Sequence, residues 1–501
     1  MLNPTPAPTP PPSLESRYRG VMLGLAVGDA LGAPVEFDSR ESILAARGPQ
    51  GVTDLEPWGR HPAGAVTDDT QMSIATAEGI LDAIRWRRFD SLVATTDSVY
   101  RAYLLWNDRQ SDPDYRRAPG NTCLSALASG RMGTPFKPLN DSKGCGTIMR
   151  IAPCALLVPD GSDAFDLAAW CGAITHGHAL GWGAGAAFAA VLERVLAGDS
   201  LIAAVEHAAQ VCRGMEGDDF AYLAAILDDA LCMDADGIPL ETRIAAVGNG
   251  EGWVAEETLN IALACALAHP SDWSAAVLSA VNITGDSDST GSVTGALMGA
   301  LLGEDAIPEA WRMQVEHSAE LGRLSDELLD ERLRRECDPY EEWVRPMGLS
   351  GRDLPAPSRP GRPTHADDWK AEPMGEAREQ LDYHEIFSAA EMRRIACGLM
   401  PYEMEDKWFV YFAEGWLHFH RSWTGFETYQ ARFEPCEDGF RVDEAWVTRD
   451  TEQYTGTDAE EDLRNLRFML EGWLAERRVE RDHGEGLDDV LRAWANFGQG
   501  M

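Results

Sequence analysis

Apolar residues recur at intervals of three and four positions through most of the first 335 residues of the chain. This spacing matches the turn of an α-helix and gives each predicted helix one apolar face. No run in this part of the sequence shows the alternation of apolar and polar residues that is typical of a strand. The pattern therefore predicts an all-α domain. Its helices are expected at about residues 16–31, 70–85, 91–106, 121–130, 163–198 (a pair), 200–213, 218–232, 241–247, 256–268, 275–281 and 288–303.

The pattern changes towards the C-terminus. Short runs rich in aromatic and β-branched residues are separated by Glu-Gly, Thr-Gly and Asp-Gly pairs, which favour tight turns between strands. A helix from Ser388 is expected before these runs and another at about residues 458–478 after them. This order predicts a small α+β domain with an antiparallel sheet. Its strands are expected at residues 407–412, 416–423, 426–433 and 440–447.

Proline-rich segments divide the chain. Residues 1–15 are rich in Pro and Thr and are predicted to form a disordered arm, while residues 345–367 combine Pro with Gly, Ser and Arg as linkers do. The sequence therefore predicts an all-α domain at residues 16–344 and an α+β accessory domain of unknown role at residues 368–501.

Composition narrows the choice of partner and compartment. The chain has 501 residues, with 82 acidic and 43 basic side chains and a net charge of −39. Such a charge opposes binding to nucleic acid or to an anionic membrane. The ten cysteines form no CxxC pair, and several lie in apolar helical stretches, as in reduced cytoplasmic proteins. The N-terminus lacks the basic and apolar regions of a signal peptide, and no uninterrupted apolar run is long enough to span a membrane.

Two short acidic turns are the main candidates for chemistry. Asp286 and Asp288, followed by Ser289, lie between an apolar run and a glycine-rich apolar helix. Asp68 and Asp69 stand between two threonines at the start of another helix. Each turn alone has an ordinary interpretation as a solvated helix cap. Two such turns suggest the halves of one site with only oxygen ligands, which favours Mg²⁺ or Mn²⁺ over zinc.

Other candidates are weaker when taken singly. The backbone from Ser142 to Gly146 could present several N–H groups to a phosphate, although glycines of this kind more often serve a turn. His176, in an apolar segment, is more often a core residue than a ligand. Trp253, in a glycine-rich loop, would either stack on a ligand or fill the core. Glu36 would ordinarily be a loop carboxylate.

Five motifs in order resemble the ADP-ribosylglycohydrolase family over roughly residues 17–340. Any one of them would be weak evidence, but the ordered set is specific. The resemblance implies the compact helical fold of that family. The motifs are Gly28-Asp29, Thr67-Asp68-Asp69-Thr70, Gly144-Cys145-Gly146, Thr175-His176 and Gly285-Asp286-Ser287-Asp288-Ser289.

The resemblance implies a role for each motif. Two Mg²⁺ or Mn²⁺ ions would be held by Thr67, Asp68, Asp69, Asp286, Asp288 and Ser289. Asp29 would lie beside the ions, and Glu36 would stand on a loop that gates the cleft. The catalytic carboxylate would be Glu36, Asp69 or Asp288. ADP-ribose would contact Asp29, Ser142, Lys143, Gly144, Cys145, Gly146, His176 and Trp253, although Cys145 stands where many relatives have Asn.

The expected function is hydrolysis that releases ADP-ribose from an ADP-ribosylated protein or another ADP-ribosyl conjugate. Water would attack the anomeric carbon of the distal ribose. Two alternatives remain open: a module that binds ADP-ribose without turnover, and an immunity protein that blocks an ADP-ribosylating toxin by binding it. The acceptor, whether arginine, serine, a base or a small molecule, is not indicated by the sequence.

The accessory domain offers one further cluster. His418, His420 and Arg421, with Trp416 and Trp423, could form a ligand-binding face. Alternating surface and core positions along one strand are the favoured interpretation of the same residues.

Overall fold

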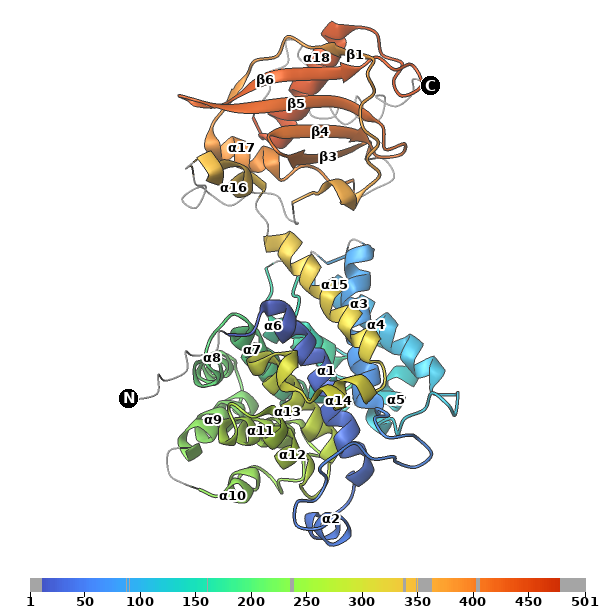
Figure 1. Ribbon diagram of the computed structural model, residues 1–501, viewed down its shortest axis with the longest axis vertical. Coiled ribbons are helices and arrows are strands. Elements are labelled where there is room, and N and C mark those ends of the chain that lie inside the picture. Colours follow the sequence, from blue (N-terminus) through green and yellow to red (C-terminus); the bar gives the residue numbers. More distant parts are fainter. Residues whose placement is uncertain are drawn as a thin grey trace, which may run out of the picture. The chain divides into compact units, whose positions relative to one another are not determined.

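The computed structural model describes residues 11–86, 88–89, 91–159, 161–234, 238–336, 339–347, 349, 363–401 and 406–477. The chain divides into two compact units, Met1–Arg332 and Leu333–Met501, which are described separately here (Figure 1). Most of the predicted arm and linker lies outside the described residues.

The first unit is helical in its described part, which confirms the predicted fold class. Apolar faces from helices far apart in sequence meet in one hydrophobic core. The helices are α1 (Leu14–Gly32), α2 (Arg40–Arg47), α3 (Asp68–Arg85), α4 (Leu92–Arg109), α5 (Asn121–Ala128), α6 (Ala164–Ala173), α7 (Ala179–Leu196), α8 (Leu201–Gly214), α9 (Asp218–Asp234), α10 (Leu240–Ile244), α11 (Ala255–Ala268), α12 (Trp273–Val281), α13 (Ser287–Leu302), α14 (Glu309–Gln314) and α15 (Ser318–Glu336), with short 3₁₀ helices that include η1 (Ala33–Val35).

Helices α1 and α13 lie against each other through facing glycines (Figure 1). A Cβ placed on Gly24 would lie 2.2 Å from the carbonyl oxygen of Gly295, and one placed on Gly28 would lie 2.0 Å from that of Gly291. The two backbones are therefore in direct contact, with no room for any side chain between them. This contact brings the C-terminal end of α1 to the N-terminal end of α13, where the second acidic turn begins.

Helix α7 has the length and apolar composition of a membrane span, but 83% of that window is buried inside the structure. A helix at the centre of a packed helical unit has this same composition, so it carries no evidence of a membrane.

The first unit ends earlier than the sequence predicts. The division falls after Arg332, whereas the predicted boundary was residue 344. Between them lies α16 (Pro339–Val344), whose Tyr340 and Val344 are buried in the core of the second unit. At the other end of the predicted linker, Thr364 is buried and donates a hydrogen bond to the carbonyl of Cys397 at 3.1 Å. Both ends of the predicted linker are therefore next to folded parts of the second unit.

The second unit contains the predicted antiparallel meander. Its sheet has the strand order β1-β6-β5-β4-β3, with β2 also paired to β6, and all of the pairings are antiparallel. The two short strands were not predicted, because two or three residues are too few to show a periodicity. The strands are β1 (Arg378–Gln380), β2 (Ile386–Phe387), β3 (Trp408–Ala413), β4 (Trp416–Arg421), β5 (Glu427–Cys436) and β6 (Gly439–Thr448).

One face of this sheet forms the core of the second unit with α16, α17 (Ala389–Ala396) and α18 (Ala459–Arg467). Ser388 caps α17 as expected, in a reciprocal capping box with Glu391. The predicted closing helix is α-helical only through α18. It then widens into a π-helical segment at Phe468–Leu474, and residues 478–501 lie outside the described residues.

The glycine contact between α1 and α13 can be tested by adding one methyl group. Gly28→Ala should lower the free energy of unfolding by about 1–3 kcal/mol or more, because the backbone of α13 must move to admit the Cβ. Gly322→Ala in α15 is the matched control: no heavy atom lies within 4 Å of its Cβ position. The control should gain about 0.5–1 kcal/mol from helix propensity. Urea denaturation measures both, and equal stability of the two variants would contradict the packing described.

Candidate metal centre

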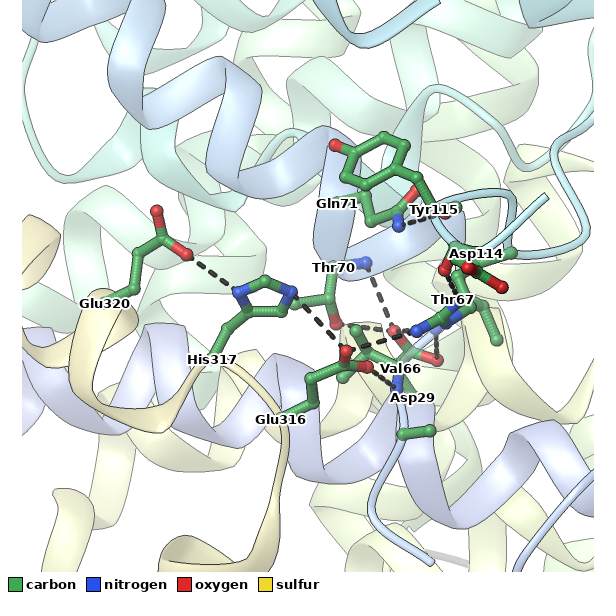
Figure 2. Close-up of polar contacts among 12 residues, drawn as sticks. Asp29, Val66, Thr67, Thr70, Gln71, Asp114, Tyr115, Glu316, His317 and Glu320 are labelled. Carbon is green, nitrogen blue, oxygen red and sulfur yellow. Dashed lines mark hydrogen bonds and ion pairs between the residues drawn. The ribbon is translucent and has the colours of Figure 1, made fainter. Parts of the chain in front are cut away.

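The carboxylate of Asp29, at the end of α1, organises the first acidic turn (Figure 2). It is fully buried and accepts hydrogen bonds from the backbone N–H of Thr67 at 3.1 Å and of Thr70 at 3.2 Å. The Thr70 hydroxyl donates a third bond at 2.5 Å. Asp29 therefore fixes the turn that starts α3. The predicted place beside the metal ligands agrees with this position, although its oxygens are used by the turn.

The first turn leaves one carboxylate oxygen free inside the protein. Thr67 caps α3, and its hydroxyl accepts a hydrogen bond from the Asp69 N–H at 3.2 Å. Asp68 accepts from the backbone N–H of Gly120 at 3.1 Å. The Oδ2 atom of Asp69 is buried and has no hydrogen-bond partner. A buried oxygen of this kind is costly unless a cation or a ligand meets it.

The second turn is held by its own helix and by the neighbouring loop. Gly285 has a φ of +112°, and the N–H of Asp286 donates to the carbonyl of Glu251 at 2.8 Å. The Ser289 N–H donates to Asp286 Oδ1 at 3.3 Å and to Asp288 Oδ1 at 3.0 Å. The Oδ2 atom of Asp286 is buried without a partner, as is that of Asp69.

The two turns form one electrostatic cluster. Burial and then the charge of Asp288 raise the pKa of Asp69 well above its usual value, and the same two causes act on Asp286. Burial is also the main cause that raises the pKa of Asp68 to about 8. Asp29 follows, with a pKa raised to about 7 by burial and by Asp288. The carboxylates therefore lie close enough to repel one another in a poorly hydrated part of the protein.

Glu36 follows the 3₁₀ helix η1 and is half-buried. Burial, and then the charges of Asp288 and Asp286, raise its pKa to about 10. Glu36 therefore faces the acidic cluster. Its loop is tied to the second turn, because the Phe37 N–H donates to the Gly285 carbonyl at 3.1 Å.

An aromatic pair stands at this loop. Phe37 has a φ of +75° and is 72% exposed, and its ring stacks on Trp253 with centroids 5.1 Å apart. Trp253 was predicted to stack on a ligand or to fill the core; its indole is only half-buried and is packed on Phe37. Phe37 was missed because nothing in the sequence distinguishes an exposed Phe from a core Phe.

The glycine loop is joined to the loop of Trp253. The Cys145 N–H donates to the Trp253 carbonyl at 3.1 Å. Burial and then Asp286 raise the pKa of the Cys145 thiol well above its usual value, so the side chain lies against the acidic cluster. Lys143 forms an ion pair with Glu256, and the Ser142 hydroxyl lies 3.2 Å from that of Thr122. Backbone N–H groups and small side chains thus form this part of the site.

His176 lies behind the glycine loop. It is 2% exposed, and a Cβ on Gly146 would lie 2.9 Å from its Cε1 atom. Burial and then the charge of Arg150 lower its pKa to about 3, so the ring is neutral. Its Nδ1 atom is 2.8 Å from the Thr175 hydroxyl. The structure places the ring against Gly144 and Gly146, where it supports the loop; contact with the ribose or a phosphate stays a prediction.

The donor set fits hard divalent cations. The six predicted ligand residues are all buried, they offer only oxygen ligands, and two of their carboxylate oxygens lack partners. Mg²⁺ and Mn²⁺ prefer such ligands, and their charge would offset the repulsion between the aspartates.

Comparisons with known proteins identify relatives of the first unit. The family model described as ADP-ribosylglycohydrolase matches residues 10–337. The ADP-ribosyl-[dinitrogen reductase] glycohydrolase of Rhodospirillum rubrum is 29% identical over 64% of this chain and 97% of its own length. The human ADP-ribosylhydrolase ARH3 is 24% identical over 62% of this chain and 93% of its own. A solved structure titled "ADP-ribosylglycohydrolase-related protein complex" aligns with a TM-score of 0.50 and 28% identity, over 63% of this chain and 98% of that one.

The repulsion in the cluster can be measured without metal. Burial raises the pKa of Asp68 from its ordinary value of 3.8 to about 8 in the folded protein. Its protonated form therefore favours folding at low pH, and this contribution is lost as the pH rises from about 4 to about 8. Asp68→Asn has no such loss. Its stability in EDTA, relative to the unsubstituted protein, should rise across this range, as urea denaturation at several pH values would show.

The same variant should bind fewer divalent ions, since it has lost a ligand charge. Asp305→Asn is the matched control, because the Asp305 side chain is 88% exposed and only pairs with Arg312 at 3.7 Å. Unchanged Mn²⁺ stoichiometry in Asp68→Asn, measured by equilibrium dialysis, would contradict the assignment of Asp68 as a ligand.

Proposed function

The chain belongs to the ADP-ribosylglycohydrolase family, and we propose that it is a metal-dependent hydrolase that releases ADP-ribose from an ADP-ribosylated protein or small conjugate. A buried cluster of carboxylates beside a glycine loop supports this proposal most directly. The cluster has buried oxygens without partners, which suit cations. The loop has two N–H groups, those of Lys143 and Gly146, that donate to no acceptor in the described residues and suit a diphosphate.

The metal centre takes its ligands from both acidic turns. Thr67, Asp68 and Asp69 would face Asp286, Asp288 and Ser289, and together they would hold two Mg²⁺ or Mn²⁺ ions. Such ions, when bound, orient the hydroxyls of a ribose and lower the pKa of a water molecule. Asp29 would not bind an ion itself. It accepts hydrogen bonds from Thr67 and Thr70 and so positions the first turn, which supplies metal ligands.

A carboxyl group must carry a proton during cleavage, because the leaving group needs one and the attacking water loses one. Asp69 and Asp288 belong to the ligand set, where a bound cation keeps them ionised. Glu36 faces the cluster from a separate loop and is not a predicted metal ligand, so its carboxyl group stays available to donate or accept a proton. We therefore favour Glu36 as the proton carrier among the three candidate carboxylates.

The ADP portion would occupy the loops beside the metal centre. Within the segment from Ser142 to Gly146, the N–H groups of Lys143 and Gly146 would bind the diphosphate, because those of Ser142, Gly144 and Cys145 already donate within the protein. His176 would be a neutral support behind the segment. The ammonium group of Lys143 is paired with Glu256, so its predicted contact with a phosphate requires that this ion pair breaks. Trp253 and Phe37 offer a stacked aromatic surface to a flat group such as a base.

The hydrolase is favoured over the two alternatives. The names of the two relatives describe hydrolases, and the complete set of oxygen ligands has no evident use in a protein that only binds ADP-ribose. No observation in the described residues supports an immunity role against a toxin. The cysteines in this part of the chain are free thiols, in keeping with the proposed cytoplasmic location.

The activity can be tested on a panel of ADP-ribosylated peptides, proteins, nucleic acids and small molecules. Free ADP-ribose should appear with Mg²⁺ or Mn²⁺, disappear with EDTA and return when the metal is restored. Asp288→Ala should lower the rate by more than about 100-fold, as expected for the loss of a metal ligand. Asp305→Asn should behave as the unsubstituted protein. Binding of ADP-ribose without cleavage of any conjugate would replace the hydrolase with the binding module.

The role of Glu36 has a separate signature. Glu36→Gln should lower kcat by about 10²–10⁴-fold, because the amide can neither donate nor accept the proton in question. Mn²⁺ stoichiometry and the affinity for ADP-ribose should stay unchanged in this variant, since Glu36 is not a predicted ligand of either. A full loss of Mn²⁺ binding would instead make Glu36 part of the metal centre.

A further inference from the structure

Two histidines of the second unit share one face of its sheet. His418 and His420 are two residues apart on β4, so both point away from the hydrophobic core, which Leu417 and Phe419 face. Tyr411 on β3 lies on the same side and stacks on both imidazole rings, with centroids 4.6 and 5.5 Å away. This face therefore holds a second layer outside the core, in which the imidazoles pack among aromatic rings that include the buried Phe409.

A β-bulge brings a carboxylate to the same place. Phe419 pairs with Tyr429, but the next residue, His420, pairs with Glu427, so Thr428 is an extra residue in β5. Without the bulge, the alternation of β5 would turn Glu427 towards the core. The bulge shifts that alternation by one residue and aims Glu427 at the two histidines.

The three side chains meet with ligand atoms that face one another. His418 Nδ1 is 2.6 Å from Glu427 Oε1, and His420 Nε2 is 3.9 Å from the same oxygen. Among the described residues, no other group of three His, Cys, Asp or Glu side chains has ligand atoms all within 4.8 Å of one another.

The hydrogen bonds of these three side chains leave His420 Nε2 without a partner. His420 is 1% exposed, its Nδ1 atom is 2.9 Å from the carbonyl of Gly425, and its Nε2 atom is buried without a partner. Glu427 is 2% exposed and accepts the N–H of Met374 at 2.8 Å on Oε2, while its Oε1 shares a hydrogen bond with His418 Nδ1, which a bound ion would replace. A hydrogen bond to the second ring nitrogen and a held carboxylate are the usual supports of metal ligands.

We propose that His418, His420 and Glu427 bind one divalent transition-metal ion of the zinc or iron class. Two imidazoles and a carboxylate are ligands of zinc sites and of non-haem iron sites, and all-oxygen sites for Mg²⁺ lack them. Ligands about 2.1 Å from a tetrahedral ion lie about 3.4 Å apart. Small rotations of the side chains would bring the present separations to that value.

The site has three protein ligands, so a fourth position is left for water or a small ligand. His418 is the least buried of the three, with 19% of its side chain exposed, and it marks the side from which an ion would enter. The family match ends at residue 337, so this site lies outside the matched part of the chain. It is independent of the proposed hydrolase centre.

The test uses the full chain after removal of metal by a chelator. Co²⁺ is the probe, because its visible spectrum separates nitrogen ligation from the weak bands of an all-oxygen site. The unsubstituted protein should show one equivalent of Co²⁺ with imidazole ligation, which Zn²⁺ displaces. His420→Gln and Glu427→Gln should each lower the affinity for this ion by more than about 100-fold.

Two variants serve as controls. Asp286→Asn should keep the nitrogen-ligated spectrum, since it affects only the acidic cluster. His384→Gln should keep it too, because His384 is an exposed histidine of the same unit that lies 3.4 Å from Asp382. If the unsubstituted chain binds no nitrogen-ligated Co²⁺, or if His420→Gln and Glu427→Gln both retain it, the site does not exist. Circular dichroism of each variant would check that a loss of the Co²⁺ spectrum is not caused by unfolding.

Discussion

The direct contact between the backbones of α1 and α13 is the constraint on which the first unit depends. Glycines face each other along both helices, and the last pairing sets Gly32 against the backbone of Asp288, where a Cβ would lie 2.4 Å from its N atom. Because the helices cannot slide or rotate without a clash, the end of α1 and the start of α13 have a fixed relation. Asp29, at the end of α1, accepts three hydrogen bonds from the first acidic turn and so fixes the position of that turn relative to α13.

This scaffold holds carboxylates where water cannot stabilise them. The carboxylates of Asp29, Asp68, Asp69 and Asp286 are all buried in one cluster, and burial and mutual repulsion raise their pKa values. A protein gains nothing in stability from such an arrangement, since apolar residues of similar size would pack there without a penalty. A role in binding cations would explain the cluster. The charge of the cations would offset the repulsion, and the oxygens of Asp69 and Asp286 that lack hydrogen-bond partners would coordinate them.

Periodicity and ordered motifs predicted the helical unit, the antiparallel meander and the buried acidic turns, because each of these depends on neighbouring residues in sequence. Features that depend on contacts between residues far apart in the chain could not be predicted from the sequence. Tyr340 is buried in the second unit although it precedes the proline-rich stretch, and the stacking of Phe37 on Trp253 joins loops far apart in the chain. Glu427 could not be grouped with His418 and His420, because strand alternation puts it on the wrong face until the bulge is known.

The central claim is that the two acidic turns together form one binuclear metal centre. Anomalous diffraction from crystals soaked in Mn²⁺ tests it most directly, because the signal locates the ions without any assumption about activity. We expect two manganese peaks in the first unit, one or both of them contacting Asp69 and Asp286, and the loss of these peaks in Asp68→Asn or Asp286→Asn. Well-ordered crystals with no peak between the two turns, at saturating Mn²⁺, would contradict it.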